Sequence, residues 1–176
     1  MITNFKIFEN SEPKLHVDLV VKSIMGNGTL RLKDAEINFD LILDNKKIGE
    51  CRLRRDESRN DTYDNDIMMI NKPYQKKGYG ERLIRFMIKW LKIDMPHVLY
   101  LKINVTSLGA LKLYKNVFGE LKDLNPNPGV GRPLPDRSPA TYNDEGEPSI
   151  SNRASKQSYL VSIYTKSELT QKRFDL

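Results

Sequence analysis

Apolar and polar residues alternate along two neighbouring stretches of the chain, residues 37–43 and 48–54. Such alternation is typical of strands with one buried face, and the short polar run between the two stretches favours a tight turn. A third apolar run, residues 66–70, ends shortly before Pro73, which disfavours continued pairing. The pattern therefore predicts an antiparallel hairpin, a polar loop at residues 55–65 and a third strand.

The period of the apolar residues changes after Gly80. They then recur every three or four residues, which places them on one face of a helix that ends before Pro96. The residues of this face are Leu83, Ile84, Met87, Trp90 and Leu91. Residues 97–105 predict a further strand, and residues 107–115 predict a second helix with Ser107 as its N-cap.

The two ends of the chain have less regular patterns. Residues 15–21 are compatible with a strand or with a short helix. Residues 125–157 contain six prolines and few apolar residues, which predicts a long loop. Because residues 159–164 again predict a strand, this loop is an insertion between two strands. We expect a single domain, residues 1–176, that carries the insertion.

Composition narrows the class of protein. A chain of 176 residues with 39% hydrophobic residues can bury one ordinary core. Cys51 is the only cysteine, so no intramolecular disulfide is possible, and no run of about 18 apolar residues suggests a membrane span. We therefore expect a cytoplasmic protein without a membrane partner. The net charge of +6 is compatible with an anionic partner, and surplus Lys is as often explained by solubility. Lys and Arg lack the interleaved aromatic residues of nucleic-acid-binding surfaces.

The junction between the third strand and the first helix carries the clearest chemical signal. It reads Gln75-Lys-Lys-Gly-Tyr-Gly80. The first N–H groups of a helix lack intrahelical partners and lie at the positive end of its dipole, so an anion of pyrophosphate size can bind there. The stretch is neither a Walker loop nor the dinucleotide-binding fingerprint. The alternative is a turn with a solvated pair of lysines.

Two motifs resemble those of a known family. Gln75-x-x-Gly78-x-Gly80, after a strand and Pro73-Tyr74, resembles the acetyl-CoA pyrophosphate loop of the GNAT superfamily of N-acetyltransferases. Residues 107–114 resemble the fourth helix of that family, and the resemblance covers residues 37–119, with residues 159–164 as the last strand. Ser107 stands where the family commonly has Asn, and Val117-Phe-Gly119 stands where Gly-Phe is usual.

The resemblance implies a fold and a cofactor site. The fold is an α/β (α+β) arrangement with a mixed, mostly antiparallel sheet, splayed central strands and helices on both faces. Acetyl-CoA is the implied co-substrate, with its pantetheine arm between the strands of residues 66–70 and 97–105. The implied cofactor-binding residues are the strand positions Met68, Met69 and Ile70, the loop residues Gln75, Lys76, Lys77, Gly78, Tyr79 and Gly80, and the helix cap Ser107.

Three residues are candidates for catalysis. Tyr114 matches the position of a phenol that, in the family, lies near the sulfur and can protonate the departing thiolate; the alternative is a core tyrosine. Asp64 and Asp66 are candidates for orienting a water or an amine, and the alternative is solvated loop carboxylates. His16, His97 and Cys51 are expected to be structural, and no spacing indicates a metal site.

The leading hypothesis is an acetyl-CoA-dependent N-acetyltransferase that acts by direct attack of an acceptor's primary amine. The acceptor is a small molecule or a protein, and the enzyme is a monomer or a homodimer. Two alternatives remain: a non-catalytic acyl-CoA-binding module, and a basic nucleic-acid-associated protein.

Overall fold

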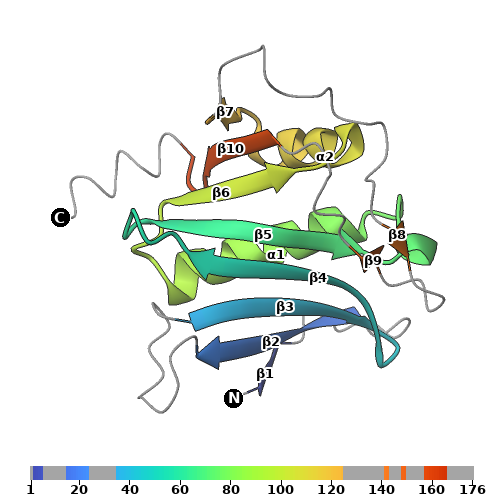
Figure 1. Cartoon of the computed structure of the whole chain (residues 1–176). Helices are drawn as coiled ribbons and strands as arrows, with labels where there is room; N and C mark the ends of the chain where they lie inside the picture. The colour runs from blue at the N-terminus through green and yellow to red at the C-terminus, as the bar shows by residue number, and fades with distance from the viewer. Residues whose placement is uncertain are drawn as a thin grey trace.

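One sheet dominates the computed structural model, which describes residues 2–5, 15–23, 35–124, 141–142, 148–149 and 157–165. Within these residues, eight strands pair in the order β1-β2-β3-β4-β5-β6-β10-β7, and β8 and β9 form a separate pair (Figure 1). The strands are β1 (Ile2–Phe5), β2 (Leu15–Ser23), β3 (Ala35–Leu43), β4 (Lys46–Arg55), β5 (Thr62–Ile70), β6 (Tyr100–Val105), β7 (Lys122–Asp123), β8 (Thr141–Tyr142), β9 (Pro148–Ser149) and β10 (Gln157–Ser162). The helices are η2 (Lys72–Tyr74), α1 (Tyr79–Asp94) and α2 (Leu108–Phe118).

The predicted hairpin is confirmed as the antiparallel pair β3–β4. Its turn places Asp44 and Asn45 at φ of 50° and 62°, a left-handed conformation that Asp and Asn tolerate better than most residues. The element that the sequence pattern left open is a strand, β2, which pairs antiparallel with β3.

The strand predicted for residues 66–70 begins earlier than the pattern indicated. β5 starts at Thr62, so the expected loop at residues 55–65 is shorter. The first half of β5 shows no alternation of apolar and polar residues in the sequence, because the residue at its buried position, Asn65, is polar and its neighbours Asp64 and Asp66 are acidic. The strand predicted for residues 97–105 starts later, at Tyr100, because Val98 N–H instead donates to the carbonyl of Met95 in a turn.

The strands β5 and β6 splay apart as expected. They pair in parallel over only four positions in the described part of the chain, from Thr62↔Tyr100 to Asn65↔Ile103. The β4–β5 register shifts at the same place, since Arg52 opposes Ile67 while Leu53 opposes Asn65. Asp66 is therefore an extra residue in β5, a β-bulge, which bends and twists a strand. The bulge begins where β5 leaves β6.

Both α-helices in the described residues cover the same face of the sheet. On this face Phe39 of β3 meets Trp90 of α1 edge-to-face at 5.4 Å between ring centroids, and the Tyr114 hydroxyl of α2 reaches Asn65 of β5. Figure 1 shows α1 behind β3, β4 and β5. The predicted apolar face of α1 is confirmed, since all five of its residues are buried. Within the described residues, no α-helix covers the other face, so the expectation of helices on both faces is not met there. Charged side chains of β3, β4 and β5 occupy that face, and an apolar helix surface would not pack against them.

The final strand enters the sheet between two earlier ones. β10 pairs antiparallel with β6 on one side and with β7 on the other, which confirms the strand predicted for residues 159–164, although it begins at Gln157 and ends at Ser162. The predicted loop at residues 125–157 lies outside the described residues, apart from β8, β9 and the first residue of β10. The single-domain organisation of residues 1–176 stays a prediction.

Candidate active site

The first part of the site is the junction between β5 and α1. Gly78 is the N-cap of α1 with φ of 81°, and Lys76 is also left-handed at 61°. Two left-handed residues so close together fold the chain tightly into the helix. The Gln75 side chain donates from Nε2 to the carbonyl of Ile70 at 2.8 Å, so it ties the loop to the end of β5.

Glycine is required at the two loop positions Gly78 and Gly80 for different structural reasons. A Cβ on Gly78 would meet nothing within 4 Å, so this position needs glycine for its φ alone. A Cβ on Gly80 would lie 3.1 Å from Leu113 Cδ2 and 3.4 Å from Met68 Cε. Gly80 therefore allows α1 to approach both α2 and the splayed end of β5.

Positive charge gathers around this junction. Residues 72–85, which run from η2 into the first two turns of α1, contain five Lys and Arg against one carboxylate. Lys77 Nζ lies 5.8 Å from the ring centroid of Tyr74, and Tyr74 packs edge-to-face against Tyr79 at 6.4 Å. Because the start of α1 adds its dipole to these charges, the junction favours an anion.

The second part of the site is the splayed end of β5. Met68, Met69 and Ile70 pair with β4 through one edge of the strand, opposite Cys51, Glu50 and Gly49 respectively. Their other edge faces β6, and the β5–β6 pairing in the described residues stops before them. Backbone groups along this edge can pair with the amides of an extended ligand, as a strand added to a sheet does.

The third part of the site is Tyr114, which lies beside the splay. Its side chain is 2% exposed, and its hydroxyl donates to Asn65 Oδ1 at 2.7 Å. Burial raises the pKa of Tyr114 well above its ordinary value, so the phenol keeps its proton at physiological pH. Sequence reasoning missed Asn65, because an amide within a polar run gives no signal of burial.

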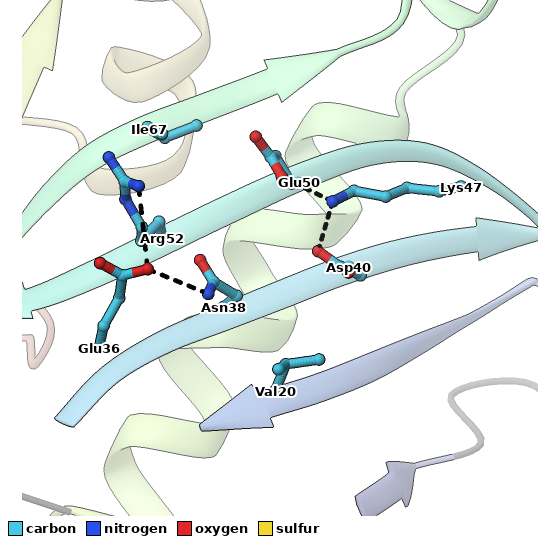
Figure 2. Close-up of a pocket in the computed structure, with 8 residues that line it drawn as sticks. All are labelled: Val20, Glu36, Asn38, Asp40, Lys47, Glu50, Arg52 and Ile67. Carbon is cyan, nitrogen blue, oxygen red and sulfur yellow. Dashed lines mark hydrogen bonds and ion pairs between the residues drawn. The ribbon is translucent and has the colours of Figure 1, made fainter. Parts of the chain in front are cut away.

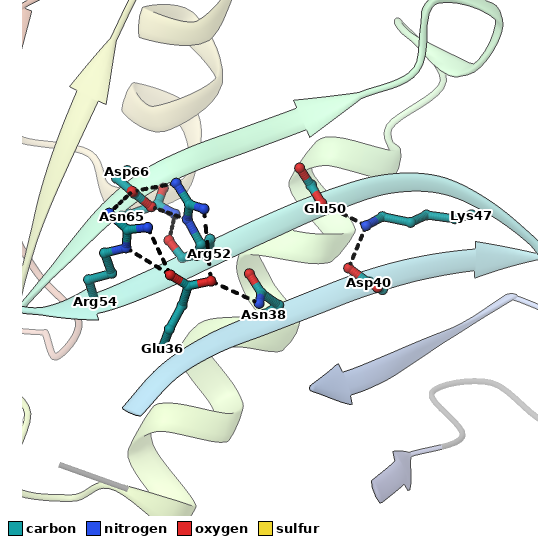
Figure 3. A network of polar contacts seen from close by, with 9 residues as sticks. All are labelled: Glu36, Asn38, Asp40, Lys47, Glu50, Arg52, Arg54, Asn65 and Asp66. Atoms are coloured by element: carbon teal, nitrogen blue, oxygen red, sulfur yellow. Dashed lines mark hydrogen bonds and ion pairs between the residues drawn. The ribbon is translucent and has the colours of Figure 1, made fainter. Parts of the chain in front are cut away.

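The candidate carboxylates lie on the opposite face of the sheet. Asp66 accepts from Arg52 Nε and Nη2 at 2.9 and 2.7 Å, and Arg54 Nη1 lies 3.5 Å away (Figure 3). Asp64 Oδ1 lies 3.4 Å from Lys102 Nζ. Burial raises the pKa of Asp64 above its ordinary value, and the charge of Lys102 only partly opposes this. Of the two, Asp64 is the better proton acceptor, because Arg52 engages both oxygens of Asp66.

A pocket of about 150 Å³ lies on this charged face (Figure 2). Its charged residues form two groups on either side of Asn38. Lys47 Nζ lies 2.9 Å from Asp40 and 2.6 Å from Glu50, while Arg52 Nη1 lies 3.8 Å from Glu36. The remaining lining residues are Val20 and Ile67.

Three other candidates have local structural partners. Ser107 Oγ accepts from Ala110 N at 3.2 Å, which confirms the predicted N-cap of α2. His16 Nε2 lies 3.6 Å from Asp18 Oδ1. Cys51 is fully buried, and burial raises its pKa to about 12, so its thiol is not a nucleophile at neutral pH.

The fold and this arrangement agree with the comparison to known families. The acetyltransferase (GNAT) family matches residues 6–119, more than half of the chain. The chain therefore belongs to the acetyltransferase (GNAT) family.

Several solved structures are similar to this chain at low sequence identity. The protein yncA of Salmonella typhimurium, solved with its cofactor acetyl-CoA, has a TM-score of 0.50 at 10% identity, over 74% of this chain and 66% of that one. The ribosomal-protein-S18-alanine N-acetyltransferase of Escherichia coli has a TM-score of 0.49 at 16% identity, over 74% and 70%. An Elizabethkingia anophelis GNAT acetyltransferase with acetyl-CoA bound has 0.46 at 13%, over 82% and 97%. The search of curated proteins found no match. In the part of the chain that the structure describes, no helix has the length and apolar character needed to cross a bilayer.

Proposed function

We propose that this protein transfers the acetyl group of acetyl-CoA to the primary amine of a small-molecule or protein acceptor. The observation that carries the proposal is the convergence of three features at one place. The β5 edge left by the splay, the glycine-lined start of α1 and the Tyr114 hydroxyl all lie along β5 between Asn65 and Ile70. Family membership supports acyl transfer as the chemistry of this site.

The residues around the junction fit the cofactor. The N–H groups at the start of α1, from Gly78 to Gly80, would hold the pyrophosphate, with charge from Lys76 and Lys77. The edge of β5 at Met68, Met69 and Ile70 would pair with the pantetheine amides. Tyr79 and Gln75 shape the loop, and Ser107 supports the site indirectly as the cap of α2.

Direct attack accounts for the chemistry with the groups present. Acetyl-CoA supplies the acyl group as a thioester. The amine nitrogen would bond to the carbonyl carbon, and the carbon–sulfur bond would break with its electron pair on sulfur. Tyr114 would give its proton to that sulfur, and Asp64, directly or through water, would receive a proton from the amine. The raised pKa of Asp64 suits this role better than that of an ordinary aspartate.

The charges on the two faces suit the two substrates. Five cationic residues lie between positions 72 and 85, beside the start of α1 where an anionic cofactor would bind. The pocket on the other face is lined by Glu36, Asp40 and Glu50, which pair with Lys47 and Arg52. An amine acceptor approaching from that face would meet carboxylates near Asp64 and Asp66. The acceptor itself is defined only as a primary amine.

One observation favours a second candidate, a non-catalytic acyl-CoA-binding module. Asp66 is held by Arg52, and the Tyr114 proton is donated to Asn65, so both groups are engaged within the protein. Isothermal titration with acetyl-CoA followed by a thiol-release assay over a panel of primary amines separates the two. Binding with amine-dependent thiol release supports the transferase, binding without release supports the module, and lack of binding refutes both.

A further inference from the structure

Asn65 is a buried carboxamide at the point where β5 changes its partners. Its side chain is 1% exposed. It is the last residue of β5 that pairs with β6, opposite Ile103, and the bulge at Asp66 follows it directly. A buried amide at such a position must have its hydrogen bonds satisfied by neighbouring groups.

The bulge provides the partners for the amide nitrogen. Asn65 Nδ2 donates to the carbonyl of Arg52 at 3.1 Å and to that of Ile67 at 2.9 Å, and it lies 3.0 Å from Cys51 Sγ. Arg52 and Ile67 are the residues that face each other across the strand pair beside the bulge. Turning the amide over would place its oxygen against two carbonyl oxygens, where no hydrogen bond can form. The bulge therefore fixes which end of the carboxamide faces α2.

The end that faces α2 is the oxygen, and an amide oxygen can only accept a hydrogen bond. Asn65 Oδ1 accepts from the Tyr114 hydroxyl at 2.7 Å. A phenol has a single proton, so this bond uses the only proton that Tyr114 can donate.

We infer that Asn65 is a positioning residue, which holds the bulge of β5 and thereby dictates that the Tyr114 hydroxyl donates to it in the absence of substrate. Its part in the reaction rests on the proposed function: Tyr114 can protonate the departing sulfur only when its hydroxyl turns away from Asn65 Oδ1. Asn65 thus connects the backbone of the splayed strand to the proton donor.

Two variants with the same number of side-chain heavy atoms and the same branching as asparagine separate this role from simple packing. Asn65→Leu and Asn65→Asp both remove the Nδ2 group that donates to the bulge carbonyls. They differ at Tyr114, because an aspartate still accepts the phenol proton in either protonation state, whereas a leucine does not. The first readout needs no activity: carbon-13 NMR of the ligand-free protein labelled at tyrosine Cζ, with the Tyr114 signal assigned by its loss in Tyr114→Phe.

We expect the Tyr114 signal to move strongly in Asn65→Leu and much less, or in the opposite direction, in Asn65→Asp. Tyr159 is the matched control, because its hydroxyl donates to Gln157 Oε1 at 2.6 Å and its signal should stay unchanged in both variants. A Tyr114 signal that moves equally in both variants would overturn the inference. If both variants fail to fold, Tyr114→Phe tests the same bond from the other side: the nitrogen-15 signal of the Asn65 amide should shift, and an unchanged signal would refute it.

The second readout is thiol release from acetyl-CoA with hydroxylamine as the acceptor. The aspartate still accepts a hydrogen bond from the Tyr114 hydroxyl, so the phenol proton is less available to the departing sulfur. We therefore expect kcat of Asn65→Asp to be roughly tenfold below that of Asn65→Leu, with similar KM for acetyl-CoA. The difference should vanish when Tyr114→Phe is added to each. Equal kcat in the two single variants would contradict the positioning role. If the NMR result holds but the wild type releases no thiol, the hydrogen-bond arrangement stands and the proposed function fails.

Discussion

Two glycines with positive φ allow a direct test of the anion site at the start of α1. Gly78, the N-cap of α1, has φ of 81°, and Gly119, the C-cap of α2, has φ of 74°. A Cβ would meet nothing within 4 Å at either position. Alanine at each site therefore introduces backbone strain without a clash, but only Gly78 lies beside the helix N-terminus where a pyrophosphate would bind.

The structure sets the expected magnitudes. A left-handed alanine at Gly78 costs about 1–2 kcal/mol, or roughly 3–6 °C in Tm for a domain of this size. Gly119 has ψ of −92°, a rarer conformation for residues with a Cβ, so Gly119→Ala should lose at least as much stability. Acetyl-CoA at a hundredfold excess over Kd should stabilise the wild type by about 2.7 kcal/mol. If the Cβ on Gly78 costs one charge-assisted hydrogen bond, Kd rises roughly tenfold, and the same ligand concentration then stabilises Gly78→Ala by only about 1.4 kcal/mol.

Thermal unfolding with and without acetyl-CoA, supported by calorimetric titration, measures both effects. We expect Gly119→Ala to lose stability and to keep the full ligand-dependent increase in Tm, whereas Gly78→Ala loses stability and about half of that increase. A Gly78→Ala protein with the full increase would refute the assignment of the pyrophosphate to the start of α1. Gly80 is a poorer site for this test, because its Cβ would press against Leu113 as well.

Three further predictions follow from the polar contacts. Tyr114→Phe should lower kcat by about 10²–10⁴-fold with little change in KM for acetyl-CoA, and steady-state kinetics showing full activity would return Tyr114 to a packing role. Glu36→Gln should reduce the free energy of unfolding at pH 7: burial opposes ionisation of Glu36, but hydrogen bonds from Arg54 and Asn38 outweigh it and lower its pKa. That stability is present above the unfolded pKa and is lost as pH falls through the folded one, so urea titrations should show the gap closing in acid. Asp64→Asn should have the opposite effect, because burial raises the pKa of Asp64. The wild type loses stability as pH rises from the unfolded pKa of Asp64 to its folded pKa, so the variant should be the more stable protein at pH 7. Equal free energies of unfolding at pH 7 would contradict the raised pKa.

The net charge of +6 is distributed unevenly over the molecule. Much of the cationic excess lies in residues 72–94, on and beside one helix, while the opposite face of the sheet carries paired carboxylates and arginines. This distribution suits a protein that binds an anionic cofactor on one face. It also makes the lysine content informative about binding, where composition alone allowed solubility as the reason.

Several elements were determined by the sequence itself. The five apolar residues of α1, the N-cap at Ser107, the β3–β4 hairpin and the glycine junction at Gly78 and Gly80 were all predicted. Each depends on side chains within a few residues of one another. Helix faces repeat every 3.6 residues, and a serine caps the helix that follows it. An Asp-Asn turn reverses the direction of the chain within two residues. Local patterns of this kind are complete in the linear chain.

The tertiary structure alone decided the rest of the site. The start of β5, the bulge at Asp66 and the parallel pairing with β6 depend on which strand lies alongside, and the insertion of β10 between β6 and β7 depends on a segment that follows much later. The bond from Tyr114 to Asn65 joins residues 49 positions apart. Asn65 looks like any loop residue in the sequence because its burial depends on the helix packed above it, and its hydrogen bonds depend on carbonyls that only a bulged strand turns toward it.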